Sequence, residues 1–163
     1  MTSENREKIQ YKINLTPYML ELNNFVLKRK GESDLLSIEK TRMNIEKSKN
    51  LDRMVLLKKT IPFAEKSSEK FKKYISLLQK ANPAGVYIWL ERTSICGTTI
   101  ISSLKDINWG FDFNCSKNGV VEFVSTDLQD KILFDFFEED GEQLLEIEVQ
   151  GTNWPKINWE EIF

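Results

Sequence analysis

The chain has 163 residues with 40% hydrophobic and 29% charged side chains, a size and composition that fit one globular domain with its own core. It contains no histidine, which excludes Ser-His-Asp and Cys-His catalysis and removes the usual zinc ligand. The formal net charge of −2 hides an asymmetry, because residues 1–81 carry 18 basic and 10 acidic side chains, whereas residues 82–163 carry 5 and 15.

The N-terminal stretch MTSENREKIQ is polar and lacks the apolar run of a secretory signal. No segment approaches the ~20 apolar residues that span a bilayer. We therefore expect a cytoplasmic protein with no membrane partner. Cys96 and Cys115 match no metal or redox spacing, and we expect two reduced thiols in strands. We expect no cofactor and no metal.

The basic half is predicted to be mainly helical. Thr16-Pro17 has the composition of a helix start and Gly31 that of a stop. The stretch Ile9–Leu15 alternates as an edge strand does. Apolar residues recur at three- and four-residue spacing in the first predicted helix: Tyr18, Met19, Leu22, Phe25 and Val26.

A second helix is predicted from Glu65 to Lys80 and ends at Asn82-Pro83-Ala84-Gly85. Its apolar face is formed by Phe71, Tyr74, Ile75 and Leu78. Residues 33–57 stay ambiguous, because their apolar positions suit a helix and also short strands.

From Val86 onward the apolar period changes to two, which favours strands. The predicted strands cover 86–90, 98–104, 107–115 and 120–125. Asn118-Gly119 indicates a hairpin loop that places Phe113 opposite Phe123 and Cys115 opposite Val121. The sequence thus predicts a single α+β domain over residues 1–163, with helices mainly from 16–81 packed on an antiparallel sheet of five to six strands mainly from 86–150.

The last predicted hairpin covers residues 131–150, with a two-residue turn at Asp140-Gly141. Pairing Glu139 with Glu142 sets Asp135 opposite Glu146 and segregates the apolar side chains. The core face then consists of Ile132, Phe134, Phe136, Leu145, Ile147 and Val149. The other face carries Asp135, Glu146 and Glu148, framed by Leu133, Phe137 and Leu144.

Residues 134–149 hold seven carboxylates and no lysine or arginine. Like charges opposite each other on a sheet cost up to ~1 kcal/mol, so this face has the character of a surface for a basic partner. Two other interpretations stay open. The face is solvated and partly covered by basic helices of the same chain, or its turn binds calcium, although the spacing matches no EF-hand loop.

The C-terminal segment contains Trp154, Trp159 and Phe163, although terminal segments are usually polar. These side chains either complete the core at the sheet edge or anchor an interface, where tryptophan is enriched.

The ending DKILFDFFEEDGEQLLEIEVQGTNWP resembles the acidic-aromatic hairpins of immunity proteins from bacterial polymorphic and contact-dependent toxin systems. The resemblance covers the last third of the chain and rests on composition and hairpin layout. It implies a cytosolic antitoxin without enzyme activity that binds and blocks one cognate toxin, often a nuclease with a basic cleft. The residues expected to bind the partner are Asp135, Phe137, Glu138, Glu139, Asp140, Glu142, Glu146, Glu148 and Trp154.

The alternative function is single-stranded nucleic-acid binding, through the basic half and the strand aromatics Tyr87, Trp89, Trp109 and Phe111. Against it, the basic residues lie mainly on predicted helices and no known nucleic-acid module is present, so a nucleic-acid partner is not expected. A carboxylate hydrolase that uses Asp135 and Glu146 as acid and base is a third hypothesis.

Overall fold

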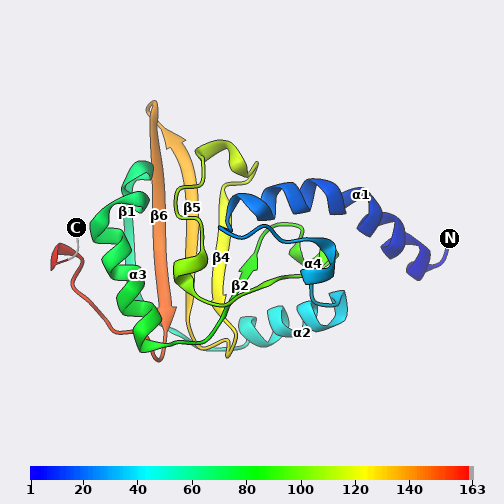
Figure 1. Ribbon diagram of the computed structural model, residues 1–163, viewed down its shortest axis with the longest axis horizontal. Helices are drawn as coiled ribbons and strands as arrows, with labels where there is room; N and C mark the ends of the chain where they lie inside the picture. The colour runs from blue at the N-terminus through cyan, green and yellow to red at the C-terminus, as the bar shows by residue number, and fades with distance from the viewer. Residues whose placement is uncertain (162–163) are drawn as a thin grey trace.

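The computed structural model describes residues 1–161 and is an α+β fold (Figure 1). In this range the helices are α1 (Ser3–Asn24), α2 (Ile38–Lys49), α3 (Glu69–Ala81) and α4 (Thr93–Cys96). The strands are β1 (Met54–Pro62), β2 (Val86–Trp89), β3 (Ile100–Ile101), β4 (Val120–Ser125), β5 (Lys131–Glu139) and β6 (Glu142–Gly151). Five short 3-10 helices complete it: η1 (Glu32–Asp34), η2 (Phe63–Ser67), η3 (Leu104–Asp106), η4 (Phe113–Cys115) and η5 (Trp159–Glu161).

The six strands form one antiparallel sheet in the order β1-β6-β5-β4-β2-β3. The predicted class, strand number and antiparallel pairing are confirmed. Most of the sheet comes from residues 86–150 as predicted, and β1 adds one strand from the basic half. The ambiguous region 33–57 contains η1, α2 and the start of β1.

Helix α1 begins earlier than predicted. The Thr2 hydroxyl caps it by accepting a hydrogen bond from the Asn5 N–H at 3.3 Å, and Pro17 lies inside the helix. The predicted edge strand at Ile9–Leu15 is therefore wrong, because the capped helix runs through it. The predicted stop at Gly31 is also wrong, because the chain leaves the helix after Asn24 and Val26 pairs with Ile107.

Helix α3 covers one face of the sheet, as Figure 1 shows. It starts four residues later than predicted, since residues 63–67 form η2, and the Ser68 hydroxyl caps it by accepting from the Phe71 N–H at 3.2 Å. All four residues of its predicted apolar face are buried: Phe71, Tyr74, Ile75 and Leu78. They join Tyr18 and Leu22 of α1 and the inner side chains of β4, β5 and β6 in the main core.

A second, smaller core lies on the opposite face of the sheet. Leu36 and Ile45 pack there against Tyr87, Trp89 and Val124 of β2 and β4. Strand β2 is consequently buried on both faces. Helix α2, which carries Ile45, covers only this end of the second face, so the part formed by β5, β6 and β1 has no helix over it in the described chain.

The predicted strand over residues 107–115 is wrong. Strand β4 pairs with β2 on one side and β5 on the other, so Phe123 lies opposite Ile88 and Ile132 rather than Phe113. Ile107, Trp109 and Phe111 still point into the core, and this accounts for the alternation in the sequence. The predicted strand over residues 98–104 is shorter in the structure, where only β3 forms. Gly119 has the expected positive φ of 66°, and a Cβ there would lie 2.2 Å from the Phe136 carbonyl oxygen.

Candidate protein-binding surface

The β5–β6 hairpin has the register predicted from its apolar pattern. Glu139 lies opposite Glu142 and Asp135 opposite Glu146. Asp140 and Gly141 both have positive φ, 51° and 79°, as a type I′ turn requires. The six predicted core side chains, Ile132, Phe134, Phe136, Leu145, Ile147 and Val149, are all buried. The hairpin therefore fixes which side chains remain on its outer face.

The outer face of β5 and β6 forms what we call the open face. It is made of Leu133, Asp135, Phe137, Leu144, Glu146 and Glu148, all of which are partly exposed. The apolar members pair with each other or with acids across the strands, Phe137 with Leu144 and Leu133 with Glu148. Apolar area beside carboxylates is thus available to a partner over these strands.

Strand β1 gives part of the open face an internal counter-charge. The Lys58 ammonium lies 3.3 Å from Glu148 Oε2 and 3.6 Å from Glu146 Oε1. Its hydrogen bond to Glu148 and the neighbouring charge of Glu146 raise the lysine pKa. The Gln150 amide also donates to Glu148. Glu146 and Glu148 therefore have a cation from their own chain, which the local sequence does not reveal because β1 becomes the neighbour of β6 only in the fold.

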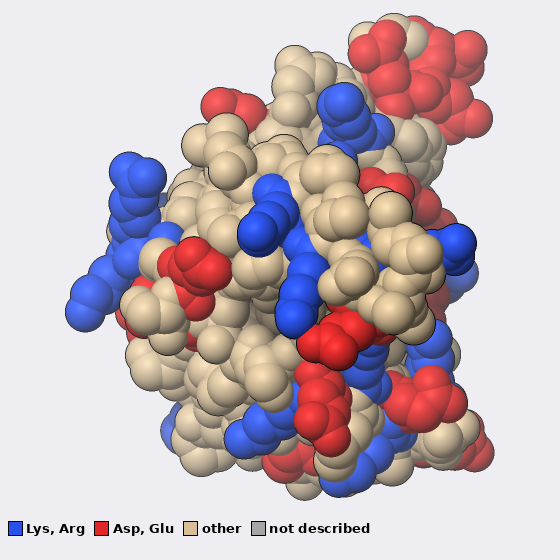
Figure 2. Space-filling model, turned by 90° about the vertical axis from the view of Figure 1, so that its right-hand side faces the viewer, with Lys and Arg blue, Asp and Glu red and all other residues tan. Residues whose placement is uncertain are grey.

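The remaining carboxylates have no such counter-charge. Glu138, Glu139, Asp140 and Glu142, which we call the acidic tip, are exposed and make no ion pair among residues 1–161, and neither does Asp135. Figure 1 shows the β5–β6 turn projecting beyond the other strands, and Figure 2 shows acidic side chains gathered at a projecting corner. The acidic tip is available to a cationic surface.

The four aromatic residues proposed to stack on bases are buried. Tyr87 and Trp89 stack on each other inside the smaller core, with ring centroids 6.2 Å apart. Trp109 and Phe111 lie in the main core. A stacking surface needs exposed ring faces, so the nucleic-acid alternative loses the residues on which it depended.

Trp154 lies in the main core and is 4% exposed. For this residue the interpretation that the tail completes the core is confirmed, and Trp154 is not available on the surface to anchor a partner. Asp130 holds it there. One carboxylate oxygen of Asp130 accepts hydrogen bonds from the backbone N–H groups of Thr152, Asn153 and Trp154 at 2.9–3.1 Å. The side chains of Trp159 and Phe163 lie outside what the structure describes.

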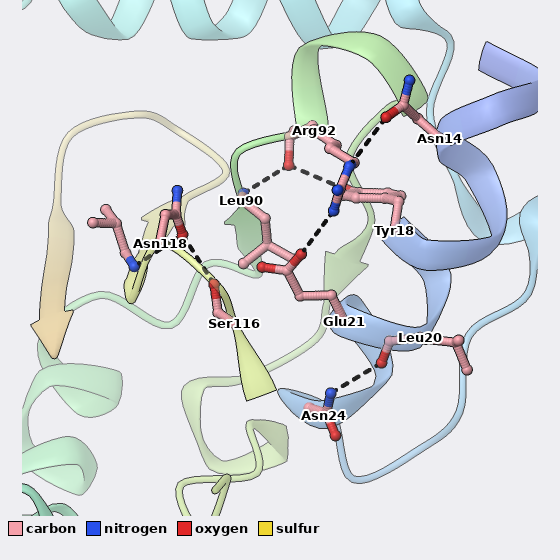
Figure 3. Close-up of polar contacts among 11 residues, drawn as sticks. Asn14, Tyr18, Leu20, Glu21, Asn24, Leu90, Arg92, Ser116 and Asn118 are labelled. Carbon is pink, nitrogen blue, oxygen red and sulfur yellow. Dashed lines mark hydrogen bonds and ion pairs between the residues drawn. The ribbon is translucent and has the colours of Figure 1, made fainter. Parts of the chain in front are cut away.

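A polar cluster joins α1 to α4 beside the loop before β4 (Figure 3). Arg92 donates to Asn14 at 3.1 Å and pairs with the buried Glu21 at 3.5 Å. The buried Tyr18 hydroxyl donates to the Gly97 carbonyl at 2.6 Å, and burial raises its pKa far above the usual value. These contacts attach the second half of α1 to the body of the protein.

Sequence reasoning missed Lys66, a lysine that is 2% exposed. Its ammonium donates to the Trp109 carbonyl at 2.8 Å and lies 4.3 Å from the centres of the Phe63 and Phe111 rings. Burial lowers its pKa to about 8. Nothing in the local pattern marks this lysine, because Trp109 and Phe111, which bury it together with the nearby Phe63, come from a distant segment.

The prediction that both cysteines lie in strands is wrong, because Cys96 is in α4 and Cys115 in η4. Both are free thiols. Within residues 1–161, no group of three or more His, Cys, Asp or Glu side chains is placed to hold a metal ion. No helix in the same range is long and apolar enough to cross a membrane.

Comparisons of the chain with protein-family models, curated proteins and solved structures found no match.

Proposed function

We propose that this protein is an immunity protein that binds a cationic toxin domain and blocks it through the acidic tip and the open face. The observation that carries the proposal is the acidic tip, four exposed carboxylates that pair with no cation of the described chain, on a projecting hairpin continuous with the open face. A nuclease domain with a basic cleft is the toxin class that suits this charge, and the encounter would take place in the cytoplasm.

The two parts of the surface have different roles in this proposal. The acidic tip steers the partner at the rim, where exposed charges mainly raise the association rate. Phe137, Leu133 and Leu144 supply the apolar contact area on the open face. Asp135 lies between them and becomes desolvated when the partner is bound, so it should slow dissociation by pairing with a buried cation.

The direct test uses the C-terminal domain of the protein encoded immediately upstream of this chain's gene, which the proposal expects to be the toxin. Mixed in equal amounts, the two proteins should elute as a 1:1 complex, and co-expression of this chain should restore growth to cells that make the toxin. Separate elution together with no protection would contradict the proposal. An oligonucleotide control addresses the alternative, since tight binding of random single strands at physiological salt would favour nucleic-acid recognition.

Variants of the surface separate its two roles. Neutralising the acidic tip (E138Q, E139Q, D140N, E142Q) should lower the association rate about tenfold or more and weaken its salt dependence. The matched control neutralises four scattered exposed acids that make no ion pair within residues 1–161 (E39Q, E46Q, D52N, E91Q) and should change the rate much less. Asp135→Asn should raise the dissociation rate, at a cost of about 2–5 kcal/mol in affinity.

The Lys58→Met variant makes more negative charge available on the open face, whereas the variants above remove it. The substitution removes the only cation paired with Glu146 and Glu148 among the described residues, so both carboxylates become available to the partner. We expect faster association with the cationic toxin domain. Slower association would show that the toxin does not contact this part of the open face.

A further inference from the structure

A second surface feature lies on the opposite side of the sheet, where α3 covers the main core. Between α3, η3 and residues 107–110 there is a pocket of about 430 Å³, which we call the α3 pocket. Its apolar walls come from Leu27, Ile75, Ile107 and Trp109, and its polar rim includes Lys72, Lys105 and Ser76. The volume lies within the ~300–1,000 Å³ of small-molecule sites.

The wall formed by Trp109 is held rigidly. Its indole N–H donates to the Leu104 carbonyl at 3.0 Å, and its own carbonyl accepts hydrogen bonds from Lys66 at 2.8 Å and Ser67 at 3.2 Å. The ring also packs edge-on against Phe71 at 5.3 Å. A fixed aromatic wall costs little conformational entropy when a ligand binds.

Another part of the lining, at Leu27, leaves apolar surface exposed to water. Leu27 is 65% exposed, although its N–H is held by the Asp106 carbonyl at 3.2 Å. A ligand that covers Leu27 and the exposed edge of Trp109 removes this surface from water, which favours binding in proportion to the area covered.

The charge at the pocket mouth is positive. Lys105 makes no ion pair among residues 1–161, and Lys72 pairs only with the exposed Glu69, at 2.9 Å. An adjoining groove of about 820 Å³ shares Lys72 and Lys105 and adds Lys73 and Lys80. The nearby Asp106 carboxylate accepts a hydrogen bond from Ser102 at 2.8 Å. A ligand with an anionic group therefore meets ammonium groups at the rim.

We propose that the α3 pocket binds a small amphipathic monoanion, with its apolar body against Ile75, Ile107 and Trp109 and its anionic group on Lys105 and Lys72. The inference does not depend on the proposed function, because the acidic tip and the open face lie on the other side of the sheet from the buried face of α3.

The experiment titrates the full chain with decanoate, below its micelle concentration, and follows binding by calorimetry and by backbone amide shifts. We expect one saturable site, with the largest shifts at Gly110, Asn108 and the Trp109 indole. Decanol and decylammonium keep the apolar body but lack the negative charge. Both should bind at least about fivefold more weakly than decanoate, a difference of ~1 kcal/mol.

Substitutions locate the site. Lys105→Met keeps an unbranched apolar side chain, one heavy atom shorter, and removes the charge, so decanoate affinity should fall about fivefold or more. Lys80→Met is the matched control, because Lys80 lines only the adjoining groove, and it should leave the affinity unchanged. Ser76→Phe should abolish binding by filling the pocket while leaving the melting temperature nearly unchanged, because Ser76 is exposed on α3.

Several results would overturn the inference. They are an absence of saturation at about 1 mM decanoate, equal affinity for decanol, or an unchanged affinity in the Lys105→Met variant. Tighter binding of an oligonucleotide or an acidic peptide that shifts the same amides would also overturn it, since that result assigns the surface to a polyanion.

Discussion

At the scale of single residues, Lys66 is an ionisable group held where water does not reach it. Its pKa lies at about 8, below the ordinary 10.5, because burial disfavours the ammonium form. The Phe63 and Phe111 rings act in the opposite direction, since their faces attract a cation. The unfolded chain keeps this proton up to the ordinary value and the folded chain loses it earlier, so the contribution of Lys66 to stability rises as pH increases above about 8.

The first prediction compares the native chain with Lys66→Met by denaturant unfolding at about pH 7 and about pH 9.5. Over this pH interval, the free energy of unfolding of the native chain should rise by about 1–2 kcal/mol relative to that of the variant. The comparison isolates Lys66, because the other groups whose pKa values burial raises, among them Tyr18, Tyr74, Cys96 and Cys115, are present in both chains. Lys70→Met, at an exposed lysine, should show no such change, and a constant difference for Lys66→Met would refute the interpretation.

Asp130 shows how one buried carboxylate organises a chain end. It has no exposed surface and accepts three backbone and two side-chain hydrogen bonds, the latter from Asn82 at 2.7 Å and Asn153 at 3.1 Å. Gly151 lets the chain pass close by, since a Cβ there would lie 1.9 Å from the carboxylate oxygen. Placement of Trp154 in the core depends on this contact.

The second prediction is that Asp130→Ala destabilises the fold by about 3–5 kcal/mol, because three backbone N–H groups lose their acceptor. Emission from the tryptophans should shift to longer wavelength under native conditions as Trp154 becomes exposed. Asp127→Ala is the control: this exposed aspartate accepts side-chain hydrogen bonds from Ser125 and Asn82 and only one backbone bond, from the Gln129 N–H, so its loss should cost about 1 kcal/mol. Similar costs for both variants would show that Asp130 has no special role.

At the scale of elements, helix α1 continues through a proline in its interior. Pro17 is exposed in the helix interior and provides no N–H for the Ile13 carbonyl. The helix persists because Tyr18 and Leu22, on the C-terminal side of the proline, are fully buried in the core. Tertiary contacts therefore maintain a helix that local preference would interrupt.

The third prediction is that Pro17→Ala stabilises the protein by about 1–2 kcal/mol, because the missing hydrogen bond forms and only part of the gain is offset by a more flexible unfolded chain. Thermal unfolding followed by circular dichroism measures the change. The control is Thr16→Ala, at the adjacent exposed position, which should stabilise the protein by no more than about 0.7 kcal/mol. A loss of stability in Pro17→Ala would indicate that the proline fits a bend that the helix needs.

Sequence patterns predicted some elements and not others, for physical reasons. The β5–β6 register was predictable because only one pairing puts all six apolar side chains on one face. The stretch 107–115 has the same alternation, yet β4 already has two partners, which no local pattern reveals. The acidic residues of the candidate surface were found by composition, whereas their neighbour Lys58 depended on the distant pairing of β1 with β6.

At the scale of the whole molecule, the two oppositely charged halves neutralise each other only locally. Among the described residues, the ion pairs between the basic and acidic halves on the sheet are those of Lys58 with Glu146 and Glu148. The acidic tip stays unpaired at one end, and the lysines around the α3 pocket stay largely unpaired on the other side of the sheet. The near-zero net charge therefore coexists with two separated charged patches.

The fourth prediction concerns retention on an anion exchanger at neutral pH. The native chain should be retained through the acidic tip despite its small net charge. Neutralising the acidic tip should lower the eluting salt concentration clearly more than neutralising Glu39, Glu46, Asp52 and Glu91, although both variants change net charge equally. Equal shifts for the two variants would show that net charge alone governs retention.

The acidic tip is also separate from the parts of the chain that make it fold. Its side chains are exposed and contribute nothing to either core, and a Cβ placed on Gly141 would meet no atom within 4 Å. Substitutions at positions 138, 139 and 142 can therefore accumulate at little cost to stability, provided that the turn keeps its positive φ. A lineage of such proteins should diverge fastest at this hairpin and acquire new partners while its sheet and helices are inherited almost unchanged.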